Sequence, residues 1–196
     1  MSSENIPPTG KVRWRRFALL LIPVGAVAAI LVGLTATGSI AASISVSGSP
    51  FEVTATQLQG TGFEQYGAIV SQANGAEHPV AVSAIRNASL TDLCQSVKVG
   101  PFTLVLRAGG GGTSVSASNL VVDADQQTGN ATFHNISIGQ DASTLTEDPG
   151  NTGAVGGFGE QADSITIDNL RQHTWLTTAG TFTLPGLSLS FSRSGC

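Results

Sequence analysis

The segment VSASNLVV, residues 115–122, sets the pattern from which the fold of this chain can be predicted. The apolar positions of its pattern are Val115, Ala117, Leu120 and Val122. They are two residues apart except for one step of three, from Ala117 to Leu120. Alternation at every second residue indicates a β-strand with one face toward a core. The odd step would turn the later side chains to the other face unless a bulge or corner intervenes. We therefore expect a bent strand whose corner lies near Asn119, since Asn tolerates a left-handed backbone.

The same pattern recurs in VTATQL (53–58), ATFHNISI (131–138) and ITIDNL (165–170), with a weaker copy at Val80, Val82 and Ile85. The residue before the later apolar position is Gln57, Asn119, Asn135 or Asn169, with Ala84 in the weak copy. These later positions fall at residues 58, 85, 120, 136 and 170, so no fixed period supports a regular solenoid. We predict a mainly β fold, an antiparallel β-sandwich or flattened β-roll. An irregular parallel β-helix is the alternative.

One short helix is expected within this β-domain. Leu90, Leu93, Cys94 and Val97 have the spacing of one helical face. Ser89 is a suitable N-cap, and Gly100 and Pro101 supply a stop. Two glycine-rich stretches, Gly109 to Gly112 and Glu147 to Gly159, are predicted to be exposed loops, and the longer one is expected to be mobile.

The amino-terminal part has a different composition. Residues 1–16 contain four basic residues and are predicted to be a cytoplasmic tail. Residues 17–42 carry no charge, and the 18 residues from Phe17 to Leu34 would span about 27 Å as a helix. This apolar helix is either a transmembrane anchor or an export signal that is cleaved near Ala41. Residues 43–196 are then an extracytoplasmic β-domain.

The charge is distributed unevenly along the chain. Residues 1–41 have a formal charge of +3, whereas residues 42–196 hold five basic and twelve acidic residues, which gives −7. A domain this acidic is unsuited to nucleic acid. It is also expected to be repelled by anionic lipid headgroups unless an anchor holds it at the membrane.

The two cysteines, Cys94 and Cys196, predict one disulfide bond in an exported protein. Such a bond would close a loop of about 100 residues and stabilise the fold by roughly 4–5 kcal/mol. The alternatives are two free thiols, or a lipidated or intermolecular Cys196.

Catalytic and metal-binding motifs are absent from the sequence. There is no G-x-S-x-G elbow, and residues 112–116 come nearest without the final Gly. A Ser–His–Asp set has no support from the spacing of His78, His134 and His173, although His173 and Trp175 could share a strand face. The acidic residues lack the calcium-loop pattern: Asp123, Asp125, Asp141, Asp148, Asp163 and Asp168. We therefore predict no catalytic residue, no metal and no cofactor. Three glycosylation triplets, beginning at Asn87, Asn130 and Asn135, are weak signals.

The chain as a whole resembles a known family. The segments that carry the resemblance are VRWRRFALL, ISVSGSPFEVTATQLQGTGFEQYG, SLTDLCQSVKVGPFTLVLRAGG and ATFHNISIGQDASTL, with a terminal Cys196. They resemble an actinobacterial family of exported proteins with a domain of unknown function, whose members often carry the automatic label cholesterol esterase. The resemblance implies export but supplies no functional residues, and the missing elbow gives that label no support.

These observations favour a cell-envelope protein, either membrane-anchored or secreted, with a non-enzymatic structural or interaction role. A binding module for lipid or another apolar ligand is the alternative, and an ester hydrolase is a weaker one. The expected partners are the membrane, through residues 17–42, and an envelope lipid or cell-surface protein.

Overall fold

The structure is a computed structural model that describes residues 47–148 and 150–196. The predicted basic tail and apolar helix lie outside these described residues. Residues Ile44–Cys196 form a compact unit of their own. Within the part that is described, no helix has the length and apolar character needed to cross a membrane.

The predicted antiparallel β architecture is confirmed, since nine strands form a single sheet in the order β6-β7-β5-β2-β1-β3-β4-β9, with β8 paired to β5. The elements are β1 (Phe51–Ser71), β2 (Glu77–Thr91), β3 (Leu93–Val99), β4 (Phe102–Ala108), β5 (Val115–His134), β6 (Ser137–Asp141), a 3₁₀ helix η1 (Ala142–Thr144), β7 (Phe158–Thr178), β8 (Thr181–Thr183) and β9 (Ser188–Ser192). All pairings among the described strands are antiparallel, so the parallel β-helix alternative is wrong.

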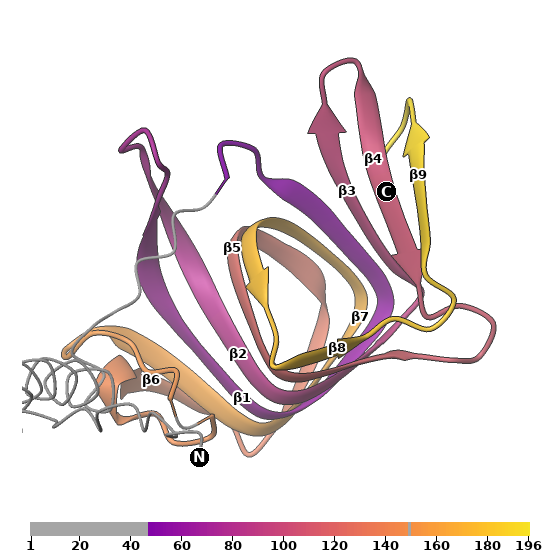
Figure 1. The fold of residues 1–196 in the computed structure, drawn as a ribbon. Coiled ribbons are helices and arrows are strands. Elements are labelled where there is room, and N and C mark those ends of the chain that lie inside the picture. The colour runs from indigo at the N-terminus through magenta and orange to yellow at the C-terminus, as the bar shows by residue number, and fades with distance from the viewer. Residues whose placement is uncertain (1–46, 149) are drawn as a thin grey trace, which may run out of the picture. The chain divides into compact units, whose positions relative to one another are not determined.

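The sheet is rolled rather than split into two layers (Figure 1). Strand β1 pairs with β2 on one side and with β7 on the other along most of its length. Strand β5 pairs with β2 through its first half and with β7 through its second half. The roll encloses a core of apolar side chains from these four strands, including Leu58, Phe63, Leu120, Ile165 and Leu170.

Left-handed asparagines bend the strands of the roll, as predicted. Asn119, Asn135 and Asn169 have φ angles of 48°, 55° and 55°. Each of these residues adds one position to the alternation, so the next apolar residue returns to the core face. Leu120 and Leu170, which follow two of these corners, are 2% and 1% exposed.

The corners of neighbouring strands lie opposite one another and form two rows across the roll. At each corner the regular pairing skips one residue, as at Thr56 opposite Asn169 and at Gly62 opposite Arg86. Four strand segments cross both rows, and in each the two corner positions are six residues apart: 56 and 62, 86 and 92, 129 and 135, 163 and 169. The shared spacing makes the strands bend together, which is how a sheet of such long strands curls around one core.

Three details of the predicted pattern need correction. The corner of the first copy is Thr56, not Gln57, because Gln57 remains paired in both ladders. The weak copy has no corner at Ala84, which pairs regularly with Glu64 and Val121. In the copy at 131–138, Ala131 is exposed and Ile138 is 66% exposed, because this segment lies toward the β6 edge of the sheet.

The helix predicted from Ser89 to Val97 is wrong. Strand β2 ends at Thr91 and β3 begins at Leu93, while Asp92 between them has a φ of 52°. Because this corner adds one residue to a strand alternation, Leu90 and Leu93 fall three positions apart and imitate helical spacing. The only helix among the described residues is η1.

Three strands leave the roll at Asp92 and form what we call the wing: β3, β4 and β9 (Figure 1). Strand β3 continues along β1 in the same register as β2. On the side away from β1, β2 pairs with β5, whereas β3 pairs with β4. The glycine loop that follows Ala108 joins β4 to β5. Asp92 fixes this branch point by accepting a hydrogen bond from Thr56 Oγ1 (3.0 Å) and donating its backbone N–H to Gly109 (3.0 Å).

Candidate functional site

One face of the wing is apolar. The ladders place Val97 opposite Leu104, and Leu104 in turn opposite Phe191. Because paired residues share a face, these three side chains stand on the same side of the sheet. The full set on this face is Gln95, Val97, Val99, Phe102, Leu104, Leu106, Leu189 and Phe191.

Much of this apolar face is open to solvent. Phe191 is 68% exposed, Leu189 62%, Phe102 51% and Val99 50%. A shallow groove of about 340 Å³ runs between Phe51, Val97, Leu104, Leu106 and Leu189, with Ser47 and Ser49 at its border. Exposed apolar residues that form one contiguous patch, rather than standing singly, often mark a functional surface.

The middle of the opposite face of the wing, at Cys94, Ser96, Thr103 and Val105, is buried, and the chain's own carboxyl-terminal residues Gly195 and Cys196 lie against part of it. Cys196 is joined to Cys94 with a Cα–Cα distance of 5.9 Å across 102 residues of sequence, which fits the predicted bridge. The backbone N–H of Cys196 also donates to Ser96 Oγ (3.1 Å). The two faces are therefore unequal: the tail lies against one and leaves the apolar one open.

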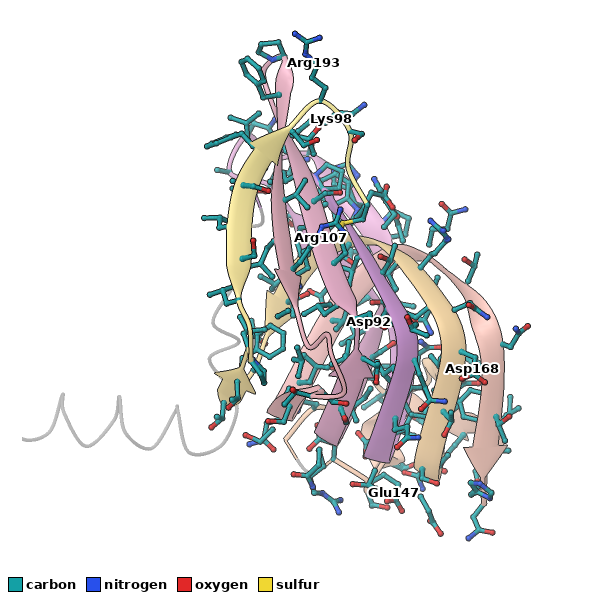
Figure 2. All side chains as sticks on the ribbon, turned by 90° about the vertical axis from the view of Figure 1, so that its right-hand side faces the viewer. Asp92, Lys98, Arg107, Glu147, Asp168 and Arg193 are labelled. Atoms are coloured by element: carbon teal, nitrogen blue, oxygen red, sulfur yellow. A yellow bond between two sulfur atoms is a disulfide. The ribbon has the colours of Figure 1, made fainter. Side chains whose placement is uncertain are left out.

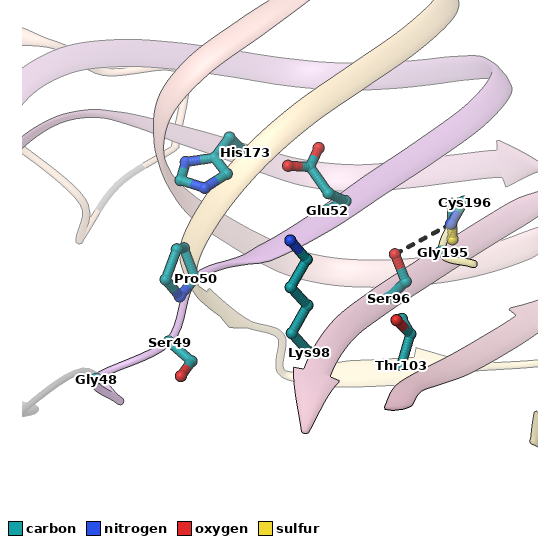
Figure 3. Close-up of a pocket in the computed structure, with 10 residues that line it drawn as sticks. All are labelled: Gly48, Ser49, Pro50, Glu52, Ser96, Lys98, Thr103, His173, Gly195 and Cys196. Atoms are coloured by element: carbon teal, nitrogen blue, oxygen red, sulfur yellow. Dashed lines mark hydrogen bonds between the residues drawn. The ribbon is translucent and has the colours of Figure 1, made fainter. Parts of the chain in front are cut away.

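A polar pocket of about 540 Å³ lies beside this face (Figure 3). Glu52 of β1 stands between its ladder partners His173 of β7 and Ser96 of β3. Lys98 reaches into the pocket toward Glu52 and His173 (Figure 3). The remaining lining comes from Gly48, Ser49, Pro50, Thr103, Gly195 and Cys196.

His173 at the rim of this pocket is held from behind by a carboxylate. Its Nδ1 lies 2.6 Å from Asp125 Oδ1, and Trp175 Nε1 donates to Asp125 Oδ2 (2.9 Å). Burial acts to raise the pKa of Asp125, but the hydrogen bonds from His173 and Trp175 outweigh it, so the pKa lies below its usual value. His78 stacks on Trp175 with ring centroids 3.9 Å apart. The predicted neighbourhood of His173 and Trp175 is present, as an edge-on contact at 6.2 Å.

The Asp–His pair does not extend to a nucleophile. Among the residues described, no hydroxyl group hydrogen-bonds to His173. Ser96, the buried pocket serine, is two strands away from His173 with Glu52 between, which corresponds to about 10 Å. Its Oγ accepts from the Cys196 N–H. The arrangement orients a histidine at a pocket rim without assembling a Ser–His–Asp set.

Buried carboxyl groups lie at the other end of the roll. Glu64 is fully buried; its Oε1 accepts from the Asp148 N–H (2.6 Å) and its Oε2 has no partner. Burial raises the pKa of Glu64 more than this hydrogen bond lowers it, and burial also raises the pKa of Asp123. The prediction of an exposed, mobile loop from Glu147 to Gly159 is therefore incomplete. Asp148 is only 3% exposed, and its backbone N–H donates a hydrogen bond to Glu64.

The other predicted candidates remain separate. His134 is exposed on β5, and Asp141 caps η1 by accepting from Ser143 N (3.0 Å) and Gly156 N (2.9 Å). Asp163 accepts from Asn135 Nδ2 (2.5 Å), and Asp168 from Gln57 Nε2 (2.7 Å). In the described part of the chain, no three His, Cys, Asp or Glu side chains are grouped as a metal site would require.

A family model described as "Family of unknown function (DUF6230)" matches residues 47–196. The chain belongs to DUF6230. No curated protein matches it, and no solved structure does. The match to DUF6230 covers the roll and the wing together, and it assigns no function to either.

Two features of this DUF6230 chain were missed by sequence reasoning. The Asp125–His173 contact joins residues 48 positions apart, through a register that no local pattern encodes. The apolar face of the wing was visible only as the alternating residues of one strand, Phe102, Leu104 and Leu106. The alternation of these residues does not reveal that the face they form is open to solvent.

Proposed function

We propose that this protein is a non-enzymatic interaction protein of the cell envelope, with the apolar face of the wing as its contact surface. The observation that carries the proposal is the exposure of Phe102, Leu189 and Phe191 on one side of a sheet whose other side is buried in its middle. Among the described strands, β9 ends the sheet order, so its outer edge can offer backbone groups to a partner.

The envelope location is supported by the sequence. Residues 17–42 have the length of a membrane-spanning helix, and the basic residues before them favour a cytoplasmic amino end. The Cys94–Cys196 bridge suits an oxidising compartment. In this proposal residues 47–196 stand outside the cytoplasmic membrane.

Photo-crosslinking in intact cells tests the contact surface. A benzophenone amino acid replaces Phe191 in the full chain, and a matched chain carries it at Phe158, which is 61% exposed in β7. We expect cross-linked products from position 191 and few from position 158. Equal yields at both positions, or none at either, would contradict the proposal.

A second candidate function is the binding of a single apolar ligand in the groove between Phe51, Leu106 and Leu189, whose volume is about 340 Å³. This volume is at the lower end of ligand sites. Mass spectrometry of lipids that co-purify with residues 44–196 tests it, and a lipid-free protein would remove it. An ester hydrolase is the weakest candidate, and a serine-reactive phosphonate probe that leaves the protein unlabelled would exclude it.

A further inference from the structure

We propose that the wing docks onto a bilayer that contains anionic lipid, with its apolar face and its outer end in contact with the membrane. This inference rests on the proposed function, because it names the partner of that contact surface. The outer end, called the tip, consists of Val99 to Phe102 with Phe191 and Arg193.

Exposed apolar side chains and a basic one gather at the tip. Thr103 pairs with Ser192, so the end of β9 lies beside the start of β4. Val99, Phe102 and Phe191 are therefore neighbours at this end, each at least half exposed. The exposed Arg193 lies beside them, two residues after Phe191, whereas Lys98 points to the opposite face toward Glu52 (Figure 3). Aromatic rings beside a long basic side chain suit the boundary between acyl chains and headgroups.

The charge of the wing is opposite in sign to that of the domain. Residues 93–108 and 188–196 carry Lys98, Arg107 and Arg193 and no acidic side chain. Of the nearest acidic residues, Asp92 lies at the root of the wing, whereas Glu52 pairs with Ser96 in the middle of β3 and faces Lys98 on the side opposite the apolar face (Figure 3). Figure 2 shows Arg193 and Lys98 at one end of the view, whereas Asp168 and Glu147 lie toward the other. The repulsion from anionic headgroups expected of a −7 domain thus does not apply to the tip.

The size of the apolar face argues against a second copy or another protein as its partner. Three strands of about five paired residues cover roughly 14 by 20 Å, or about 300 Å². A stable protein interface buries about 800 Å² on each partner. A membrane sets no such minimum, because it surrounds an inserted edge on all sides.

The described chain starts at the border of the same groove. Ser47 borders the groove, and only residues 43–46 separate it from the apolar segment 17–42. If the spanning helix ends at Leu34, the thirteen steps to residue 47 reach no more than about 47 Å when fully extended. A membrane anchor at 17–42 would therefore keep residues 47–196 within a limited distance of the membrane. A weak surface contact then adds to an existing anchor, as in other two-signal attachments.

Vesicle binding of residues 44–196 tests the inference without that anchor. These residues form a compact unit with its own core and disulfide, so they can be studied separately. Phosphatidylcholine vesicles are compared with vesicles in which about a third of the lipid is phosphatidylglycerol. Each basic residue near an anionic surface strengthens binding about fivefold, so Arg193 at the tip predicts an increase of about fivefold. Added salt should reverse it.

Matched substitutions locate the contact. The double change Phe102→Ser and Phe191→Ser should reduce partitioning at least tenfold, while Ile69→Ser with Phe158→Ser, which are equally exposed on the roll, should not. Arg193→Gln should reduce it about fivefold and Arg171→Gln should leave it unchanged. As a second readout, Phe191→Trp should shift its fluorescence to the blue when anionic vesicles are added.

Three outcomes overturn the inference. They are no partitioning into anionic vesicles at low salt, equal partitioning of the tip and control doubles, and a Phe191→Trp emission that stays unchanged. The protein could fail to bind anionic vesicles and yet form an oligomer, seen by light scattering, that Phe102→Ser with Phe191→Ser disrupts. In that case the membrane inference is wrong and the proposed contact surface stands. If neither is seen and position 191 gives no cross-links in cells, both are wrong.

Discussion

His173 Nδ1 lies 2.6 Å from Asp125 Oδ1, and this contact forms where the pairing of β5 and β7 is interrupted. Ala124 pairs with Thr174 and Gln126 with His173, which leaves Asp125 and Trp175 outside the regular ladder. The bulge lets one carboxylate accept from both His173 and Trp175. Because an ionised carboxylate only accepts, His173 donates from Nδ1 and its Nε2 is the nitrogen left for the pocket.

The change Asp125→Asn should weaken this arrangement. A single amide oxygen cannot accept from both rings as well as a carboxylate does, and the loss is about 1 kcal/mol of unfolding free energy at a site one-third exposed. Nitrogen-15 NMR of the imidazole should show the wild-type Nδ1–H tautomer and a mixture in the variant. An unchanged tautomer would contradict the assigned role of Asp125.

The stability loss in Asp125→Asn should depend on pH. The folded pKa of Asp125 is lowered, so its stabilising effect is complete above the ordinary carboxyl range and is lost as the pH falls through the folded pKa. Asp125→Asn should therefore cost stability at neutral pH and almost none in strong acid. Glu77→Gln, at an exposed position with no side-chain hydrogen bond among the described residues, is the control and should change little.

Glu64→Gln should stabilise the protein at neutral pH. Burial raises the folded pKa of Glu64, so this group favours folding below its unfolded pKa and loses that effect as the pH rises through the folded pKa. Gln keeps an oxygen for the Asp148 N–H without burying a charge. We expect Tm to rise by about 2–4 °C, or about 1 kcal/mol, measured by calorimetry near pH 7.5. A lower Tm in the variant would refute this account.

The corner at Asn169 offers a test of the bent strands. Asn169 has a φ of 55°, and its side chain makes no hydrogen bond among the described residues. It therefore stabilises the corner by tolerating a left-handed backbone. Asn169→Ala should cost about 1–2 kcal/mol of unfolding free energy and Asn169→Gly much less. Asn87→Ala, at an exposed β2 position outside the left-handed region, should be nearly neutral. Equal costs for the Ala and Gly variants at position 169 would exclude a backbone origin.

Removing the bridge should destabilise the domain strongly. The double change Cys94→Ser and Cys196→Ser is expected to lower the unfolding free energy by about 2–5 kcal/mol in denaturant titrations. Thiol counting on the unfolded, non-reduced wild-type protein should find none. Two titratable thiols would show that the bridge does not form in solution.

The bends of this fold could be predicted because their signal is local. Asn119 and Asn169 stand where an odd step interrupts the alternation, and both are left-handed corners. The same logic misled at Asp92, whose corner between Leu90 and Leu93 produces the spacing of a helix. At residues 90–93 a bulged strand and a helix have the same spacing of apolar residues, and they differ in the partners of their backbone hydrogen bonds. Here β1, a distant part of the sequence, pairs with the backbone on both sides of Asp92.

The candidate sites were beyond prediction for a different reason. His173 and Trp175 are two residues apart, so their contact follows from strand geometry alone. Asp125 reaches them only through the register of β5 with β7. The net charge of residues 42–196 likewise concealed the wing, because Lys98, Arg107 and Arg193 come together only when β9 pairs with β4.

The pairing of β1 with β7 has a consequence for how the protein is made. Phe51 pairs with Thr174, and Tyr66 pairs with Gly159. During synthesis, β1 therefore cannot form this pairing until about a hundred further residues have been made. Such distant pairing slows folding and leaves a long strand edge unprotected in the meantime. Nascent β1 is therefore the segment for which holding chaperones would compete, and the time until β7 is available affects the yield of native protein.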